Sequence, residues 1–241
     1  MKKLKSIPLM MSLLIIFSLS SCGLLQRGLE PQQEDNKTYK LQNFDRLDIG
    51  NAFNISVKKS TTFRIEATGD VRDIEDLVVK EQNGLLKIYY QNKWRIRRYR
   101  MEIEIEMPTL KEVDFSGASV STVKGFNDLN SLRIDLSGAS KATFLTSVKT
   151  YEIDLSGASE LDLEGNSEKI IADLSGASTL NAFDTKVETA QLDISGASSG
   201  RVSVSKQLQV QASGASKVRY RGNPEVKSDL SGSSKVTKDQ E

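Results

Sequence analysis

Apolar and polar residues alternate through the second half of this chain, and the alternation recurs in near-identical units. Each unit contains Ser-Gly-Ala-Ser, or Ser-Gly-Ser-Ser in the last one, and successive motifs start 18 to 21 residues apart. Apolar positions two apart predict β-strands, because successive side chains of a strand point to opposite faces. Each unit therefore holds at least two short strands and two turns. The motifs start at Ser116, Ser137, Ser156, Ser175, Ser195, Ser213 and Ser231.

Alignment of the units on this motif produces columns of equivalent residues. A carboxylate stands two residues before the motif in every unit except one, where Gln211 replaces it. The positions directly before and after this carboxylate are mostly apolar and are the candidate core. The carboxylate column consists of Asp114, Asp135, Asp154, Asp173, Asp193 and Asp229.

A period of about 20 residues is typical of stacked units, none of which buries its own apolar face. A propeller blade needs about 40 residues, whereas a coil of a β-solenoid fits the period directly. We therefore predict an all-β fold, a parallel β-helix with coils of about 20 residues, over residues 113–237. At each corner we expect a glycine with positive φ, an alanine that points inward, and serine hydroxyls that bond between coils.

The preceding segment, residues 41–112, also alternates but lacks the motif. Asn83-Gly84 predicts a hairpin turn. We expect irregular first coils that cap the solenoid, with a separate small sheet as the alternative. The candidate strands are Leu47–Ile49, Phe53–Val57, Phe63–Ala67, Leu77–Lys80, Leu85–Tyr90, Lys93–Arg97 and Met101–Met107.

Residues 1–21 predict a secretory signal peptide, with three lysines followed by an apolar stretch too short to span a membrane well. The stretch ends in Leu-Ser-Ser before Cys22, which resembles a bacterial lipobox. Cys22, the only cysteine, would then carry the lipid, and the alternative is an ordinary signal peptide with a stray cysteine. Residues 22–40 are polar and predict a flexible tether. The residue after the cysteine is Gly23 and not the aspartate that resembles an inner-membrane retention signal. This favours the outer membrane, with the protein facing the periplasm or the cell surface.

Charge offers no argument for a nucleic-acid partner. The chain has 33 basic and 32 acidic residues, and loss of residues 1–21 removes three lysines and no acid. The mature chain is thus slightly acidic. A basic run, formed by Lys93, Arg95, Arg97, Arg98 and Arg100, nevertheless precedes Glu102, Glu104 and Glu106. We expect the two runs to lie side by side as cross-strand ion pairs, with binding of an anion, such as an anionic glycan, as the alternative.

The aspartate column requires compensation, because carboxylates stacked about 4.8 Å apart repel each other. Hydrogen bonds from serine hydroxyls and backbone amides are the favoured explanation, and a row of bound cations is the alternative. One aspartate per coil is too few for the six to eight oxygens that calcium prefers. We expect no metal and no cofactor.

Catalysis finds little support. The chain has no histidine, which excludes Ser-His-Asp and Cys-His mechanisms. Seven equivalent Ser-Gly corners are not seven active sites. A β-helix enzyme acting on polysaccharides would need a few unique acids in a groove, whereas the acids here are periodic.

Several stretches resemble one family of bacterial lipoproteins, the "putative auto-transporter adhesin, head GIN domain" family. They are residues 44–57, 84–88 and 107–113, followed by the Ser-Gly-Ala-Ser array, so that the resemblance covers residues 44–236. It implies a right-handed β-helix on a lipid anchor and supplies no catalytic or ligand residues. The leading hypothesis is a non-enzymatic envelope protein for adhesion or for binding of a glycan or protein. Its rival is a structural module that binds another envelope protein or associates into a homo-oligomer.

Overall fold

The computed structural model describes residues 33–95 and 98–240. The chain is 67% strand and 2% helix, with parallel coils stacked about 19 residues apart into a β-solenoid of about seven turns. The predicted fold class is therefore confirmed. The signal peptide, Cys22 and Arg97 lie outside the described residues. No helix in the described part of the chain is long and apolar enough to cross a membrane.

The described residues form sixteen strands, which join into one sheet, and one short helix. The elements are β1 (Glu34–Tyr39), β2 (Arg46–Ile49), β3 (Phe53–Lys59), β4 (Arg64–Asp70), α1 (Val71–Glu75), β5 (Leu77–Gln82), β6 (Leu85–Tyr90), β7 (Met101–Met107), β8 (Glu112–Phe115), β9 (Val120–Leu136), β10 (Lys141–Leu155), β11 (Glu160–Leu174), β12 (Thr179–Ile194), β13 (Ser199–Ala212), β14 (Lys217–Arg221), β15 (Glu225–Leu230) and β16 (Lys235–Lys238).

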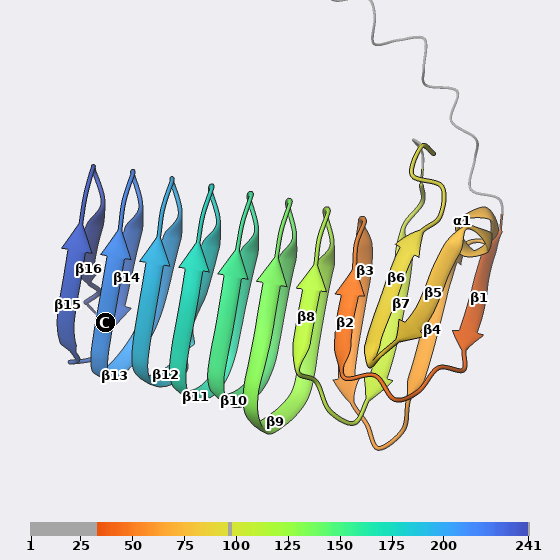
Figure 1. Cartoon of the computed structure of the whole chain (residues 1–241), viewed down its shortest axis with the longest axis horizontal. Helices are drawn as coiled ribbons and strands as arrows, with labels where there is room; N and C mark the ends of the chain where they lie inside the picture. The colour runs from red at the N-terminus through yellow and green to blue at the C-terminus, as the bar shows by residue number, and fades with distance from the viewer. Residues whose placement is uncertain (1–32, 96–97, 241) are drawn as a thin grey trace, which may run out of the picture. The chain divides into compact units, whose positions relative to one another are not determined.

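Each repeat forms one coil, and the Ser-Gly-Ala-Ser corners connect successive long strands (Figure 1). The coils pair in parallel, so that Asp154 lies between Asp135 and Asp173, and Leu155 between Leu136 and Leu174. Because the register repeats, each apolar column of the sequence becomes a continuous row inside the solenoid. The residues directly before and after the aspartate column are buried from Val113 to Ala212.

The N-terminal segment continues this stack, although not in chain order. Strand β2 pairs in parallel with both β6 and β8, and β3 pairs in parallel with both β7 and β9. After β3 the chain forms β4, α1 and β5, and then returns as β6 and β7. Strand β7 lies between β3 and antiparallel β4, and β6 lies between β2 and antiparallel β5. The hairpin predicted at Asn83-Gly84 is confirmed, with φ of 54° and 82°.

Two local predictions in this segment are wrong. The flexible tether was expected to extend to residue 40, but β1 occupies Glu34–Tyr39 and pairs antiparallel with β4. The strand expected at Lys93–Arg97 is absent from its described residues, which form a turn. Helix α1 was not anticipated; the Asp70 side chain caps it by accepting a hydrogen bond from the Arg72 amide at 3.1 Å.

The corners differ from the prediction in which side chain points inward. The alanines are exposed, whereas the last serine of the motif is buried, as at Ser140 and Ser159. The hydroxyl of Ser140 donates to the carbonyl oxygen of Ser137 at 2.6 Å and lies 3.1 Å from that of Phe115 in the previous coil. A small hydroxyl can occupy this inward position because the corner backbone supplies acceptors. Contact between serine hydroxyls is seen at Ser178 and Ser198, 3.4 Å apart.

The aspartate column forms a row from Asp114 to Asp193, and the register extends it to Asp48. Gln211 separates Asp193 from Asp229. Lys87 binds Asp48 at 2.6 Å and Arg133 binds Asp135 at 2.9 Å. The serine and amide donors expected for these carboxylates do not appear among the hydrogen bonds of the described residues, so this expectation is wrong.

Together with partial burial, neighbouring carboxylates in the row raise the pKa of two of its members. Partial burial, and then the carboxylates of Asp48 and Asp135, raise the pKa of Asp114. Partial burial, and then Asp193 and Asp154, raise the pKa of Asp173. The row therefore opposes folding when it is ionised.

The corner glycines lead to a first prediction. Gly157 has a φ of 73°, and a Cβ built there would lie 2.5 Å from the Gly138 carbonyl oxygen. We expect Gly157→Ala to lower the free energy of unfolding by at least roughly 1–2 kcal/mol, the cost of a left-handed conformation for an L-residue. Urea denaturation followed by circular dichroism measures this. The exposed neighbour provides the control: Ala158→Ser should change stability by less than about 0.5 kcal/mol, and equal losses in both variants would contradict the prediction.

The aspartate row leads to a second prediction. Because its pKa is raised in the fold, Asp173 holds its proton more tightly there than in the unfolded chain. The free energy of unfolding therefore falls as the pH rises from the ordinary value of 3.8 through the raised one, and the penalty is complete above it. We expect Asp173→Asn to stabilise the protein near neutral pH by roughly 0.2–1 kcal/mol and to weaken this dependence. Urea denaturation across this pH range tests it, with Asp184→Asn, outside the row, as the control; destabilisation by Asp173→Asn at neutral pH would contradict it.

Candidate ligand-binding site

The segment between β6 and β7 carries the basic residues, and backbone contacts with the end of α1 hold its beginning. The amide of Gln91 donates to the Asp76 carbonyl oxygen at 3.0 Å, and that of Asn92 donates to the Asp76 side chain at 3.2 Å. The amide of Trp94 donates to the Asn92 side chain at 3.0 Å. The chain is therefore fixed on both sides of Lys93.

Asp73, on α1, is the centre of the polar cluster. Its side chain is buried, and one carboxylate oxygen lies 3.3 Å from Arg95 and 3.2 Å from Arg98. The other oxygen accepts a hydrogen bond from the Tyr99 amide at 2.9 Å. A buried carboxylate requires such compensation, so Asp73 fixes the positions of two basic side chains.

Arg98 links this cluster to the core of the solenoid. Its guanidinium donates to Asp76 and, at 2.6 Å, to the Asn92 carbonyl oxygen. It also lies over the Tyr90 ring, 3.7 Å from the centroid, within the range of a cation–π contact. Tyr90 packs against Phe53 in an edge-to-face arrangement with centroids 4.9 Å apart.

The expected pairing of the basic run with the glutamates of β7 is therefore wrong. Strand β7 lies between β3 and β4, so the basic run does not pair with it. Arg100 approaches Glu102 at 3.7 Å, whereas Glu106 lies 3.9 Å from Arg64 of β4. Arg95 and Arg98 are instead neutralised by aspartates of α1 and its end.

A pocket of about 520 Å³ lies beside this cluster. It brings together Lys93, Arg95, Arg98 and Arg100, which are four of the five basic residues selected from the sequence. Apart from Ala52, the remaining lining is polar or aromatic: Asn51, Asn54, Tyr90, Asn92 and Tyr99. We call this the arginine pocket.

Tyr90 is an unusual member of the arginine pocket. Its side chain is buried, and its hydroxyl has no hydrogen-bond partner among the described residues. Burial raises the pKa of Tyr90, so the hydroxyl stays protonated at neutral pH. The hydroxyl oxygen is itself inaccessible to solvent, so Tyr90 contributes its ring to the pocket wall and leaves one buried polar atom unpaired.

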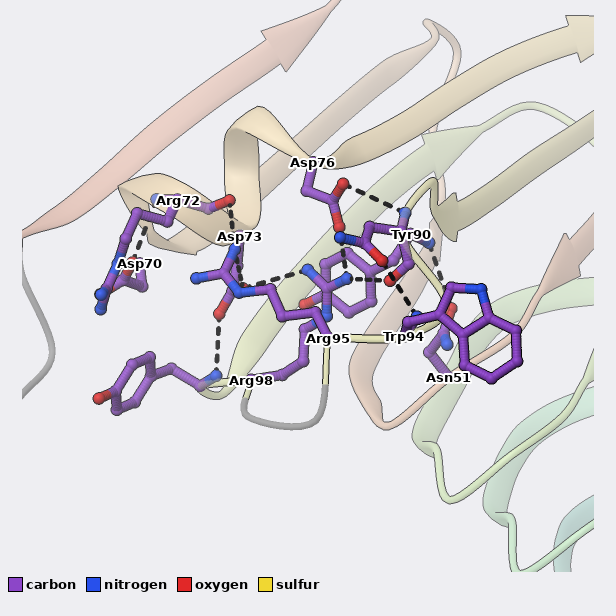
Figure 2. Close-up of polar contacts among 11 residues, drawn as sticks. Asn51, Asp70, Arg72, Asp73, Asp76, Tyr90, Trp94, Arg95 and Arg98 are labelled. Atoms are coloured by element: carbon purple, nitrogen blue, oxygen red, sulfur yellow. Dashed lines mark hydrogen bonds and ion pairs between the residues drawn. The ribbon is translucent and has the colours of Figure 1, made fainter. Parts of the chain in front are cut away.

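Trp94 extends from the same segment and is 91% exposed. Figure 2 shows its indole directed away from the arginine cluster. A large aromatic side chain in this state gains nothing from packing, so it offers a flat surface for stacking.

The aspartate row does not contribute to the arginine pocket. Asp154, Asp173 and Asp193 line a different groove of about 460 Å³, together with Arg133 and Glu152. Across residues 33–95 and 98–240, no group of three or more histidine, cysteine, aspartate or glutamate side chains could hold a metal ion.

Sequence reasoning selected the basic residues but missed Asp73, Asp76, Asn51 and Tyr90. A signal for the helix was present, because Asp70 precedes an amphipathic turn and is a favoured N-cap residue. That this turn would lie against Arg95, Arg98 and Tyr99 depends on the out-of-order stacking of β6 and β7, which no local pattern indicates.

Solved structures share the fold. A putative adhesin from Bacteroides fragilis NCTC 9343 superimposes with a TM-score of 0.80 at 18% identity, over 88% of this chain and 99% of that one. A putative adhesin from Parabacteroides merdae ATCC 43184 has a TM-score of 0.68 at 18% identity, over 86% and 97%. A protein from Parabacteroides distasonis ATCC 8503, described as a putative lipid binding protein, has a TM-score of 0.69 at 16% identity, over 86% and 97%.

Comparison with curated proteins finds no match. A family model, in contrast, matches residues 43–224, which include β2, the arginine pocket and all the complete repeat coils. The chain therefore belongs to the "putative auto-transporter adhesin, head GIN domain" family.

Proposed function

We propose that this protein is a non-enzymatic, lipid-anchored component of the cell envelope that binds an acidic glycan at the arginine pocket. The observation that carries the proposal is the convergence of four basic side chains on one pocket beside an exposed tryptophan. Membership of an adhesin-like family supports a place at the cell envelope or surface.

The chemistry of the lining suits a uronate. Guanidinium groups bind carboxylates through paired hydrogen bonds, and Arg98 and Arg95 are already oriented by Asp73. The side-chain amide nitrogens of Asn51 and Asn54, both in the pocket lining, can donate to sugar hydroxyls. Trp94 can stack on the apolar face of a neighbouring sugar ring.

Preorganisation supports binding rather than a purely structural role for the whole set. Arg98 is held by two aspartates and a carbonyl oxygen, so little side-chain entropy remains to be lost. Arg100 is held less firmly, because its side chain is 77% exposed and its ion pair with Glu102 is long, at 3.7 Å. Substitution of Lys93 and Arg100 should therefore reduce ligand affinity most while reducing the stability of the fold least.

The binding prediction uses oligogalacturonate as the probe and the full chain in detergent. We expect Lys93→Ala combined with Arg100→Ala to weaken binding at least tenfold, about 1.4 kcal/mol, as measured by isothermal titration calorimetry at low ionic strength. Trp94→Ala should weaken it without changing its salt dependence, because stacking involves no charge.

The control variant removes two exposed lysines from the repeats, Lys149→Ala with Lys169→Ala, and should bind like wild type. An uncharged galactose oligosaccharide should not bind. Vesicles with phosphatidylglycerol test a lipid phosphate as the source of the anion, a comparison motivated by the neighbour described as lipid binding. Absence of oligogalacturonate binding, or equal loss in the control variant, would refute the glycan proposal.

The anchoring prediction concerns Cys22. We expect Cys22→Ala to appear in the soluble fraction after cell lysis, whereas the wild type sediments with membranes, because a diacylglyceryl group supplies the hydrophobic attachment. Immunoblotting of the two fractions measures this, and Ser20→Ala serves as the control. Equal sedimentation of Cys22→Ala and wild type would show that Cys22 is not the attachment site.

A further inference from the structure

The C-terminal coil differs from every other coil of the repeat array. Strand β15 pairs with β13, and β16 pairs with β14, and each of them has a neighbour on one side only among the described strands. Both strands therefore present a free row of backbone donors and acceptors. The opposite end is different, because α1 and the antiparallel strands β1, β4 and β5 follow β6 and β7 there.

The apolar rows of the core are uncovered at this coil. Leu208 and Ala212 are 0% and 5% exposed, whereas Val226 and Leu230, directly next to them in register, are 36% and 42% exposed. Val236 pairs in register with Val218 of the preceding coil; Val218 is buried, whereas Val236 is half-buried. An interior row that ends in exposed valine and leucine is the arrangement expected of an unfilled stacking surface.

The charges on β15 indicate what can cover it. Outward-facing residues alternate in sign: Glu225, Lys227, Asp229. If two copies of β15 pair antiparallel about Ser228, Lys227 of each lies opposite Asp229 of the other, and Val226 lies opposite Leu230. If they pair about Lys227, Glu225 lies opposite Asp229, which is unfavourable. The strand is therefore complementary to itself in the register centred on Ser228.

Strand β16 is compatible with the same symmetry. Ser228 lies four residues before Gly232 and Thr237 lies four residues after Ser233, so they are equidistant from the corner. One twofold axis can therefore pass near both, and β16 then pairs with β16 of the second copy about Thr237. A twofold contact of this kind closes on itself and stops at a dimer.

We propose that this C-terminal coil, formed by β15 and β16, binds the same coil of a second copy of the chain end to end. The two solenoids join through antiparallel pairing of β15 with β15 and β16 with β16, which continues the apolar rows across the junction. The inference does not depend on the proposed glycan function, because the arginine pocket lies near the other end of the strand order.

The first test is the mass of the full chain in detergent, by sedimentation velocity over a range of concentrations. We expect a monomer–dimer equilibrium, and we expect Leu230→Lys to raise the dimer dissociation constant at least tenfold. Val120→Lys is the matched control, because Val120 is an exposed apolar residue, 53% exposed, on a coil far from the end. A wild-type monomer at all concentrations, or equal effects of both variants, would overturn the proposal.

The second test addresses the register and does not depend on the apolar residues. Lys227→Asp places acids opposite Asp229 in both symmetry-related pairs and should weaken the dimer, as should Asp229→Lys. The double variant exchanges the two charges, restores the attraction and should dimerise within about threefold of wild type. A double variant as weak as the single ones would overturn the register.

A cysteine at the axis gives a geometric readout. Directly opposed residues of antiparallel strands have Cα atoms within the range that a disulfide spans. In a Cys22→Ala background, Ser228→Cys should form a covalent dimer under mild oxidation, whereas Gln191→Cys, on an internal coil, should not. Equal crosslinking at both positions would indicate random collision and would contradict the proposal.

Discussion

In-register stacking of identical coils is the constraint on which the rest of this structure depends. A unit of about 19 residues cannot bury its own apolar side chains, so each coil depends on the coils stacked against it. Parallel pairing places every residue beside its equivalent in the next coil. The result is rows of apolar side chains inside the solenoid, and rows of glycine and of buried serine at the corner. The same constraint forces carboxylates into a row, where their mutual repulsion opposes the stack that the apolar rows stabilise.

Stacking also makes the two ends of the solenoid special, since an end coil lacks one neighbour. At the N-terminal end the chain interrupts its own order: β6 and β7 are inserted outside β2 and β3, and antiparallel strands with a short helix follow. The insertion creates the long connection that carries the basic residues and places it against α1. The candidate ligand site is thus a product of the capping, not of the repeat. The C-terminal coil has no such insertion among the described residues, and its core valine and leucine remain exposed.

Asp73 shows how one buried charge organises this region. With its carboxylate removed from water, two arginines and a backbone amide must compensate it, and this places Arg95, Arg98 and Tyr99 beside the helix. The basic run therefore divides into two parts, arginines that belong to the fold and an exposed lysine and arginine at the rim. Asp73 and Asp76 already compensate Arg95 and Arg98, so the uncompensated charge of the arginine pocket lies mainly on Lys93 and Arg100.

The sequence by itself determined the all-β class, the coil length, the core rows and the glycine corners, because these depend on a period that each unit carries. It also indicated most strands before the repeats, since alternation is local. Only the tertiary structure decided that the corner serine rather than the alanine is buried, and that β7 pairs with β3 and β4. It alone also decided that Arg95 and Arg98 bind Asp73 and Asp76, far from them in the sequence. The reason is physical: a repeat transmits its register along the stack, whereas a non-repeating cap is arranged by long-range packing and charge compensation that no neighbouring residues encode.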